Sequence, residues 1–294
     1  MTAASSSPLE RLLALLDLEC VGEDAFRGYS PPTAGPMVFG GQAIAQALVA
    51  ARRTVPADRP AHSLHGYFVL AGDPKTPIDY TVERVRDGKS FTTRRCTAKQ
   101  RGSTIFSLEA SFQIVEQGFE HSFEPPEVPG PETLATTSAL SERLKSFMPR
   151  GALERMEKDS ALDIRFVDLE GMLGGAHPGK TRQNIWFRIV DPMPGDDAVH
   201  QAVLAYLSDM TLLNTALAAH GRSIFDHTLQ IASLDHALWF HRPFRADEWL
   251  LYAQDSPNAS GGRALTRGQL FTRDGRLIAS VSQEGLIRQR GAKI

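Results

Sequence analysis

Apolar and polar residues alternate along the chain with two periods, one typical of strands and one typical of helices. In residues 106–113 apolar side chains alternate with polar ones, the pattern of a strand with one buried face. Alanine-rich runs at 41–51 and 199–219 predict helices, and strand-like runs follow them at 63–68 and 233–240. A single long apolar helix has to be buried, most simply inside a curved sheet. The pattern therefore predicts an α+β protein in which each half wraps an antiparallel sheet around one helix.

The two halves also match each other in sequence. Residues 88–113 and 261–286 align at a constant offset of 173, and the identical pairs include Gly88/Gly261, Thr93/Thr266, Arg94/Arg267, Gly102/Gly275 and Ser107/Ser280. Asp87-Gly88 and Asp274-Gly275 are hairpin-turn dipeptides within strand-like surroundings. Chance similarity between two β-rich segments is the alternative, but the repeated order of helix and strands favours a duplication.

A stretch rich in proline and glutamate separates the halves. Residues 123–132 contain four prolines and cannot continue a helix or a sheet. We therefore expect an N-terminal domain at 1–118, a linker at 119–160 that is partly helical after residue 133, and a C-terminal domain at 161–294. Near the start of the chain, Ser7-Pro8-Leu9-Glu10 has the form of a helix cap with a capping box.

Composition narrows the class of protein. The 294 residues are 42% hydrophobic and 22% charged, which is typical of a globular protein, and the formal charge of −2 provides no global attraction to nucleic acid or an anionic membrane. Cys20 and Cys96 are the two cysteines, a usage that favours a reducing compartment. No apolar run is long enough for a membrane span, and no secretory signal is evident. The cytoplasm is the expected location.

Several familiar motifs are absent or lack their structural context. Residues 174–181, GGAHPGKT, satisfy the phosphate-loop pattern, but the run at 183–190 predicts a strand where a phosphate loop needs a helix. We interpret the segment as a surface loop. There is no serine-hydrolase elbow, dinucleotide-binding loop or zinc-protease motif. His62 and His65 lie three apart in a predicted strand, which does not favour a metal site.

Three polar residues of the second half occupy positions where apolar residues are expected. Gln283 continues the apolar face of the last strand, at the position where the first half has Ala110. Asp209 lies in the most apolar helical stretch, and Ser233 opens the strand that follows. Burying such groups without partners is costly, so they are expected to bond one another or to perform chemistry. Individually they could be a helix cap, a strand-end amide and a turn hydroxyl; together they could orient a water molecule and remove its proton.

Over nearly its whole length the chain resembles the type II acyl-CoA thioesterases, which are built from two fused hotdog domains. The resemblance rests on an ordered set of segments: FGGQ at 39–42, RDGKSF at 86–91, LAYLSD at 204–209, IASLDH at 231–236, WFHRPF at 239–244 and QEG at 283–285. It implies hydrolysis of fatty acyl-CoA to a free acid and CoA. The family holds the nucleophilic water with an Asp, a Thr and a Gln, which fall on Asp209, Ser233 and Gln283.

Two departures from the family stand out. Serine replaces threonine at 233, which keeps the hydroxyl but loses the methyl group that restricts its rotamers. Leu70-Ala71 stands where the family often has Arg-Pro, so a substrate contact from such an arginine is in doubt. We expect Asp209 to be the general base and Gly40, Gly41 and His65 to contact substrate.

The expected mechanism requires no metal or cofactor, because a thiolate is a good leaving group. Since Ala110 replaces the glutamine in the first half, we expect one active site per chain. The acyl chain is expected in an apolar tunnel between sheet and helix, and uncovered edge strands predict a homo-oligomer. Two alternatives stay open at this point: an enoyl-CoA hydratase-like double hotdog, for which Asp235-His236 would be a poor dyad, and a non-catalytic acyl-CoA-binding protein.

Overall fold

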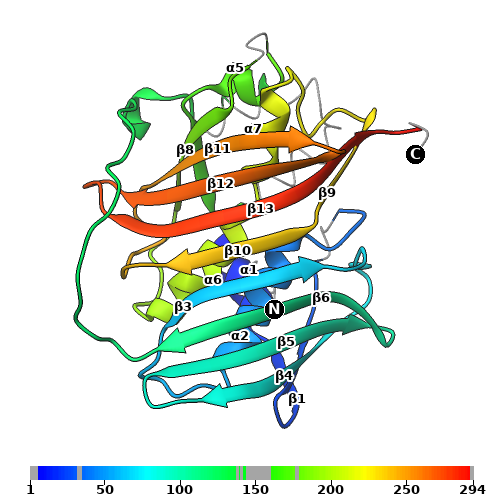
Figure 1. The fold of residues 1–294 in the computed structure, drawn as a ribbon, viewed down its shortest axis with the longest axis vertical. Coiled ribbons are helices and arrows are strands. Elements are labelled where there is room, and N and C mark those ends of the chain that lie inside the picture. Colours follow the sequence, from blue (N-terminus) through cyan, green and yellow to red (C-terminus); the bar gives the residue numbers. More distant parts are fainter. Residues whose placement is uncertain are drawn as a thin grey trace, which may run out of the picture.

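The computed structural model describes residues 6–31, 35–136, 160–175 and 179–291, together with residues 139, 142 and 143. Within these residues the strands form one antiparallel sheet of 13 strands. The sheet is curved, and the central helices pack against one of its faces (Figure 1).

The elements of the first half match the predicted pattern. Helix α2 and the strand-like runs at 63–68 and 106–113 form where they were predicted, and the capping box of Ser7 and Glu10 is present with both of its hydrogen bonds. The elements are α1 (Pro8–Leu16), β1 (Glu19–Gly22), β2 (Ala25–Gly28), α2 (Gly40–Arg52), β3 (Ala61–Phe68), β4 (Ile78–Asp87), β5 (Phe91–Gln100) and β6 (Ser103–Gln113).

The second half repeats the order of two strands, a helix and four strands, with α5 added between its first two strands and with its central helix and the next strand each divided in two. Its elements are β7 (Leu162–Phe166), α5 (Leu169–Met172), β8 (Arg182–Ile189), α6 (Asp197–Ser208), α7 (Leu212–Ala218), β9 (Leu229–Ser233), β10 (Asp235–Phe240), β11 (Leu250–Ser260), β12 (Arg263–Thr272) and β13 (Leu277–Gln289). In both halves a glycine with positive φ forms the turn before the last long strand, Gly102 at +82° and Gly275 at +88°.

The prediction of one continuous helix over 199–219 is wrong. The helix breaks after Ser208 into α6 and α7. In a continuous helix the Ser208 carbonyl would accept from the N–H of Leu212. It instead accepts a hydrogen bond from the hydroxyl of Tyr252 at 2.8 Å, and the chain turns at Asp209.

The prediction of a single strand over 233–240 is also wrong. The chain leaves the sheet at Leu234, so Ser233 ends β9 and Asp235 begins β10, and both strands pair with β13. Ala237 pairs with Ser282 and Ser233 with Gly285, so three residues between these pairs (234–236) face two on β13 (283 and 284). This one-residue shift in register separates the two strands.

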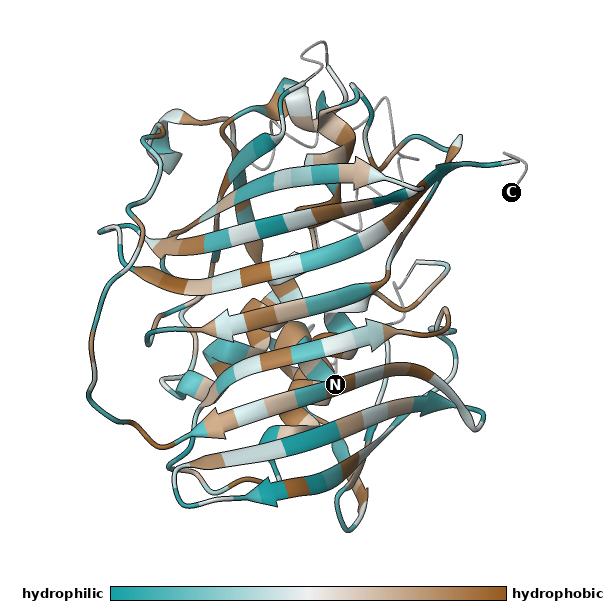
Figure 2. Ribbon diagram, viewed as in Figure 1, coloured by the Kyte–Doolittle hydropathy of each residue, from teal (hydrophilic) through white to brown (hydrophobic). Residues whose placement is uncertain are grey.

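The two halves meet at the β3–β10 pair, where His236 lies opposite Gly66. Helices α2 and α6 pack against each other behind this pair of strands (Figure 1). Apolar and polar residues alternate along the central strands (Figure 2), as expected for a sheet with one face against the helices. The core therefore extends without interruption from one half to the other.

The segment between the halves runs along one side of the sheet (Figure 1). Residues 114–130 contain no helix or strand, and a single 3₁₀ turn, η1, covers Pro131–Thr133. The carbonyl of Pro129 accepts a hydrogen bond from the indole of Trp186 at 3.0 Å, so part of this segment is attached to the second half. Most of 133–160, predicted to be partly helical, lies outside the described residues.

The glycine-rich loop at 174–181 is not a phosphate loop. It follows the short helix α5, and β8 begins at Arg182, so a strand follows it, as predicted; residues 176–178 lie outside the described part. No helix among the described residues is both long enough and apolar enough to cross a membrane.

Candidate functional site

Asp209 lies at the break between α6 and α7. It is the C-terminal cap of α6, and its carboxylate lies against the start of α2, beside Gly40. Ser233 is the last residue of β9, and Gln283 lies in the middle of β13, 1% exposed. The broken helix and the divided strand thus both occur at predicted site residues.

The three predicted catalytic residues contact one another. The Gln283 amide donates from Nε2 to Asp209 Oδ1 at 2.9 Å and to Ser233 Oγ at 2.7 Å. The Ser233 hydroxyl donates to the same carboxylate oxygen at 3.3 Å. A carboxylate, a hydroxyl and an amide are therefore gathered at one point between the sheet and the helices.

The other oxygen of Asp209 faces the first turn of α2. A Cβ placed on Gly40 would come within 2.5 Å of Asp209 Oδ2, which shows how closely the carboxylate approaches the backbone there. The start of a helix carries partial positive charge and free N–H groups, and it favours a nearby anion. Among the described residues, the backbone N–H groups of Gly40 and Gly41 have no hydrogen-bond partner.

Gly40 and Gly41 both lie where the chain is closely packed. A Cβ on Gly41 would come within 2.2 Å of the Tyr206 carbonyl on α6 and 2.5 Å of the Phe39 ring. The absence of both side chains lets α2 begin directly against the end of α6. The carboxylate of Asp209 lies beside Gly40. The predicted contact of Gly40 and Gly41 with substrate stays a prediction.

His65 does not join this group. It lies on β3 between the buried residues Leu64 and Gly66, and its own side chain is exposed. Its ring contacts the Trp239 ring edge to face, with centroids 4.9 Å apart. Because alternate residues of a strand point to opposite faces, His65 lies on the face of the sheet away from Gln283 and the helices.

His236 also lies beside the three residues, a position that the sequence pattern did not predict. His236 is 1% exposed, and its Nδ1 lies 2.8 Å from Gln283 Oε1. Its Nε2 lies 2.9 Å from the hydroxyl of Ser208, the residue before Asp209. Strand alternation did predict that Asp235 and His236 point to opposite faces, and Asp235 indeed accepts from the backbone N–H of Glu284 at 2.6 Å. A buried histidine beside an unusual buried glutamine was the available signal.

Burial lowers the pKa of His236, and the nearby carboxylate of Asp209 acts in the opposite direction. Burial also raises the pKa of Tyr252, which keeps its hydroxyl protonated as the donor to Ser208. Both groups are therefore expected to be uncharged at neutral pH, so the network around the Asp209 carboxylate consists of neutral donors.

An apolar hollow of about 340 Å³ lies elsewhere, between α1, α2 and α6. Leu48 and Val49 line it from the last turns of α2, and Val199 and Ala202 line it from the first turns of α6. Asp209 is at the opposite end of α6, next to the first turn of α2, so this hollow is not part of the site. A tunnel for an acyl chain stays a prediction.

In the described part of the chain no three His, Cys, Asp or Glu side chains cluster as metal ligands would.

Comparison with known proteins agrees with this architecture. The family model described as acyl-CoA thioesterase matches residues 155–286, and the model of the acyl-CoA thioesterase N-terminal domain matches residues 29–113. A hotdog-fold protein of unknown function from Alicyclobacillus acidocaldarius superposes with a TM-score of 0.76 over 96% of this chain and 98% of its own, at 18% identity. The predicted double hotdog fold is confirmed.

Two relatives are much closer in sequence. "Acyl-CoA thioesterase 2" of Haemophilus influenzae is 39% identical over 283 residues, 96% of this chain and 99% of the relative. The crystal structure of acyl-CoA thioesterase II TesB2 from Mycobacterium marinum is 43% identical, with a TM-score of 0.79 and coverage of 95% and 99% of the two chains. This chain therefore belongs to the type II acyl-CoA thioesterases, a family of hydrolases.

Proposed function

We propose that this protein hydrolyses fatty acyl-CoA thioesters to free fatty acid and CoA, using Asp209, Ser233 and Gln283 to activate water. The observation that supports this proposal best is the position of the Asp209 carboxylate. Its Oδ1 accepts from Gln283 and Ser233, while its Oδ2 lies against the start of α2. A base and a set of helix N–H groups are thus adjacent, as thioester hydrolysis requires.

In the proposed reaction Asp209 removes a proton from a water that Ser233 and Gln283 also hold. The water oxygen attacks the thioester carbonyl carbon and forms a tetrahedral intermediate with a negatively charged oxygen. The N–H groups of Gly40 and Gly41, which have no hydrogen-bond partner among the described residues, would donate to this oxyanion. When the intermediate collapses, the carbon–sulfur bond breaks, and the proton held by Asp209 passes to the CoA thiolate. No covalent enzyme intermediate is formed.

The test is thiol release from a medium-chain acyl-CoA, followed with a thiol-reactive dye. Asp209→Asn keeps the size of the side chain and removes the base, so we expect a loss of about 10²–10⁴-fold in kcat. Asp235→Asn is the matched control. Asp235 accepts only a backbone hydrogen bond from Glu284 among the described residues, and an asparagine oxygen can still accept it.

The outcomes of this experiment distinguish a thioesterase from a binding protein and from a hydratase. Release of thiol by wild type and by Asp235→Asn, but not by Asp209→Asn, supports the proposal. Wild-type protein that binds acyl-CoA without releasing thiol would mean a binding protein. Consumption of an enoyl-CoA double bond without thiol release would mean a hydratase. Full activity in Asp209→Asn would remove the carboxylate from the mechanism.

A further inference from the structure

His236 lies behind Gln283, on the side away from the proposed water. It connects two parts of the site that are far apart in sequence, because one ring nitrogen contacts Gln283 and the other contacts Ser208, the neighbour of Asp209. The imidazole is completely enclosed, with 1% of its surface exposed. It cannot touch substrate, so any effect on the reaction must pass through Gln283 or Ser208.

The direction of each hydrogen bond follows from the carboxylate. Asp209 can only accept, so the Gln283 amide must present its Nε2 to Asp209, and its Oε1 points at His236. An amide oxygen also only accepts, so the proton of the neutral imidazole must be on Nδ1. Nε2 is then an acceptor for the Ser208 hydroxyl.

The imidazole therefore excludes the other orientation of the amide. If the Gln283 amide turned over, its oxygen would face the Asp209 carboxylate and its N–H₂ would face the Nδ1–H of His236. Both contacts would be repulsive. The Ser208 hydroxyl also lies 3.0 Å from the Ala205 carbonyl one turn earlier in α6, so its single proton is shared between that carbonyl and Nε2 of the ring. The ring is therefore held at both nitrogens.

The first half of the chain lacks both members of this pair. Ala110 occupies the position of Gln283, and Gly66, aligned at an offset of 170, occupies that of His236. The Phe106 ring fills the space at Gly66, where a Cβ would come within 2.5 Å of it. The histidine thus occurs only in the half that has the glutamine.

We propose that His236 is a positioning residue, whose Nδ1–H holds Gln283 with its amide nitrogen turned toward Asp209 and Ser233. This inference rests on the proposed function, and it adds a residue that the water-binding group alone does not include. His236 acts on the orientation of the water, so it should influence kcat and leave substrate affinity unchanged.

Two substitutions distinguish the roles of the two ring nitrogens of His236. In His236→Asn the amide nitrogen can replace Nδ1 and still donate to Gln283, whereas in His236→Gln it reaches the position of Nε2, near Ser208. We expect His236→Asn to keep kcat within about 3-fold of wild type, and His236→Gln to lose about 10- to 100-fold in kcat with KM within about 2-fold. Steady-state thiol release measures both constants, and thermal unfolding measures the fraction folded.

A double-mutant cycle tests whether the effect of His236 on kcat passes through Gln283. If His236 acts through Gln283, then adding His236→Gln to Gln283→Ala should cause no further loss of kcat. Equal losses in His236→Asn and His236→Gln, or an undiminished loss in the Gln283→Ala background, would overturn the inference and indicate a purely structural histidine. These outcomes are independent of the Asp209→Asn result, which tests the proposed function itself.

Discussion

At the scale of single residues, the site depends on two adjacent glycines that have different neighbours. The space where Gly40 would carry a Cβ is occupied by a side-chain oxygen of Asp209, 2.5 Å away. The corresponding space at Gly41 is occupied by the backbone carbonyl of Tyr206, 2.2 Å away. A carboxylate can rotate away from an added methyl group, but a backbone carbonyl in a packed helix cannot move without shifting the helix.

We therefore expect alanine at these two positions to have different effects. Gly40→Ala should displace the Asp209 carboxylate and reduce kcat by about 10- to 100-fold, with little change in stability. Gly41→Ala should force α2 away from α6 and destabilise the fold by about 1–3 kcal/mol. Thiol-release kinetics and urea unfolding of both variants provide the measurement. Equal kinetic and stability losses in the two variants would contradict this distinction.

At the scale of elements, the sequence predicted those features that depend on local periodicity. The alternation in the last strand correctly indicated that Gln283 faces the core, where it is 1% exposed. The break in the helix at Asp209 was not predictable in this way, since residues 199–219 are uniformly compatible with a helix. The hydroxyl that competes for the Ser208 carbonyl belongs to Tyr252, 44 residues away. The contact between His236 and Gln283 likewise depends on strand register, which the sequence pattern alone does not define.

The internal repeat is also imperfect at this scale. Arg94 and Arg267 align in sequence, yet Arg94 is 1% exposed, whereas the Arg267 side chain is 56% exposed and pairs with Asp255. The reason is register: Ala110 pairs with Arg94, but its counterpart Gln283 pairs with Thr266, one residue short of Arg267. A one-residue shift moves a side chain to the other face of the sheet.

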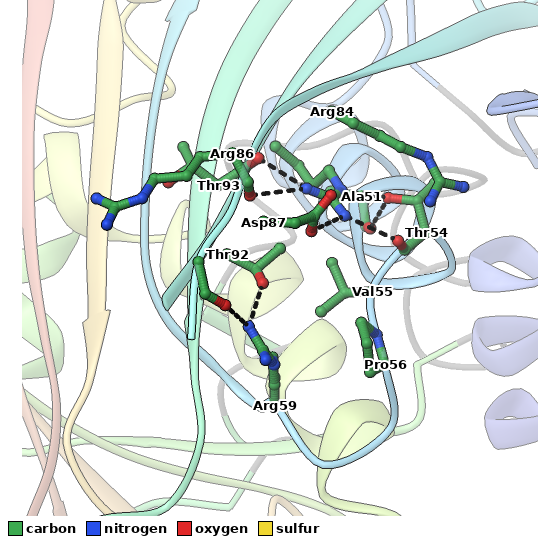
Figure 3. Close-up of polar contacts among 12 residues, drawn as sticks. Ala51, Thr54, Val55, Pro56, Arg59, Arg84, Arg86, Asp87, Thr92 and Thr93 are labelled. Atoms are coloured by element: carbon green, nitrogen blue, oxygen red, sulfur yellow. Dashed lines mark hydrogen bonds and ion pairs between the residues drawn. The ribbon is translucent and has the colours of Figure 1, made fainter. Parts of the chain in front are cut away.

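Arg94 attaches the end of α2 to the β4–β5 hairpin. Its guanidinium donates to the hydroxyl and carbonyl of Thr54, to the carbonyls of Arg86 and Thr93, and to the Asp87 carboxylate at 2.6 Å. Figure 3 shows these acceptors gathered between the hairpin and the loop after the helix. Each of its nitrogens is bonded, which offsets the cost of burying the charge.

We expect Arg94→Met to destabilise the protein by about 2–4 kcal/mol, because it removes the donor from the buried hydroxyl and carbonyl of Thr54 and from two partly buried carbonyls. Arg267→Met is the matched control, and loss of its exposed ion pair should cost about 1 kcal/mol or less. Urea unfolding of the two variants measures the difference. Similar losses would mean that the buried hydrogen bonds of Arg94 contribute no more than an exposed pair.

At the scale of the whole molecule, two halves that share one core retain one complete set of site residues. The sheet continues from one half to the other through β3 and β10, and the helix start in the first half supplies Gly40 to the carboxylate of the second. Neither half therefore contains the site alone. The boundaries predicted for separate domains do not interrupt the sheet, and the stability of the site is tied to that of the full chain.

Histidines with a lowered pKa make the stability of the whole molecule depend on pH. Burial lowers the pKa of His62, His200, His236 and His241 below the usual 6.5. Below that value the unfolded chain takes up protons that the folded protein resists, so the free energy of unfolding should fall as pH falls from about 7 toward 5. Carboxyl groups whose pKa is lowered, such as Asp247, act in the same direction only below about pH 4.

His200 provides the sharpest test of this pH dependence. It is 1% exposed and accepts a hydrogen bond at Nδ1 from the Ala246 N–H at 3.0 Å, so protonation of that nitrogen would break the bond. In His200→Asn the amide oxygen can still accept from Ala246 but cannot titrate. The variant should lose less stability than wild type between pH 7.5 and 5.5, and the slopes of the free energy of unfolding against pH should differ by up to about 1.4 kcal/mol per pH unit.

Urea unfolding at both pH values measures these slopes. Equal slopes in wild type and variant would show that His200 has the same pKa in the folded and the unfolded chain. The loss of stability at low pH would then come from His62, His236 and His241.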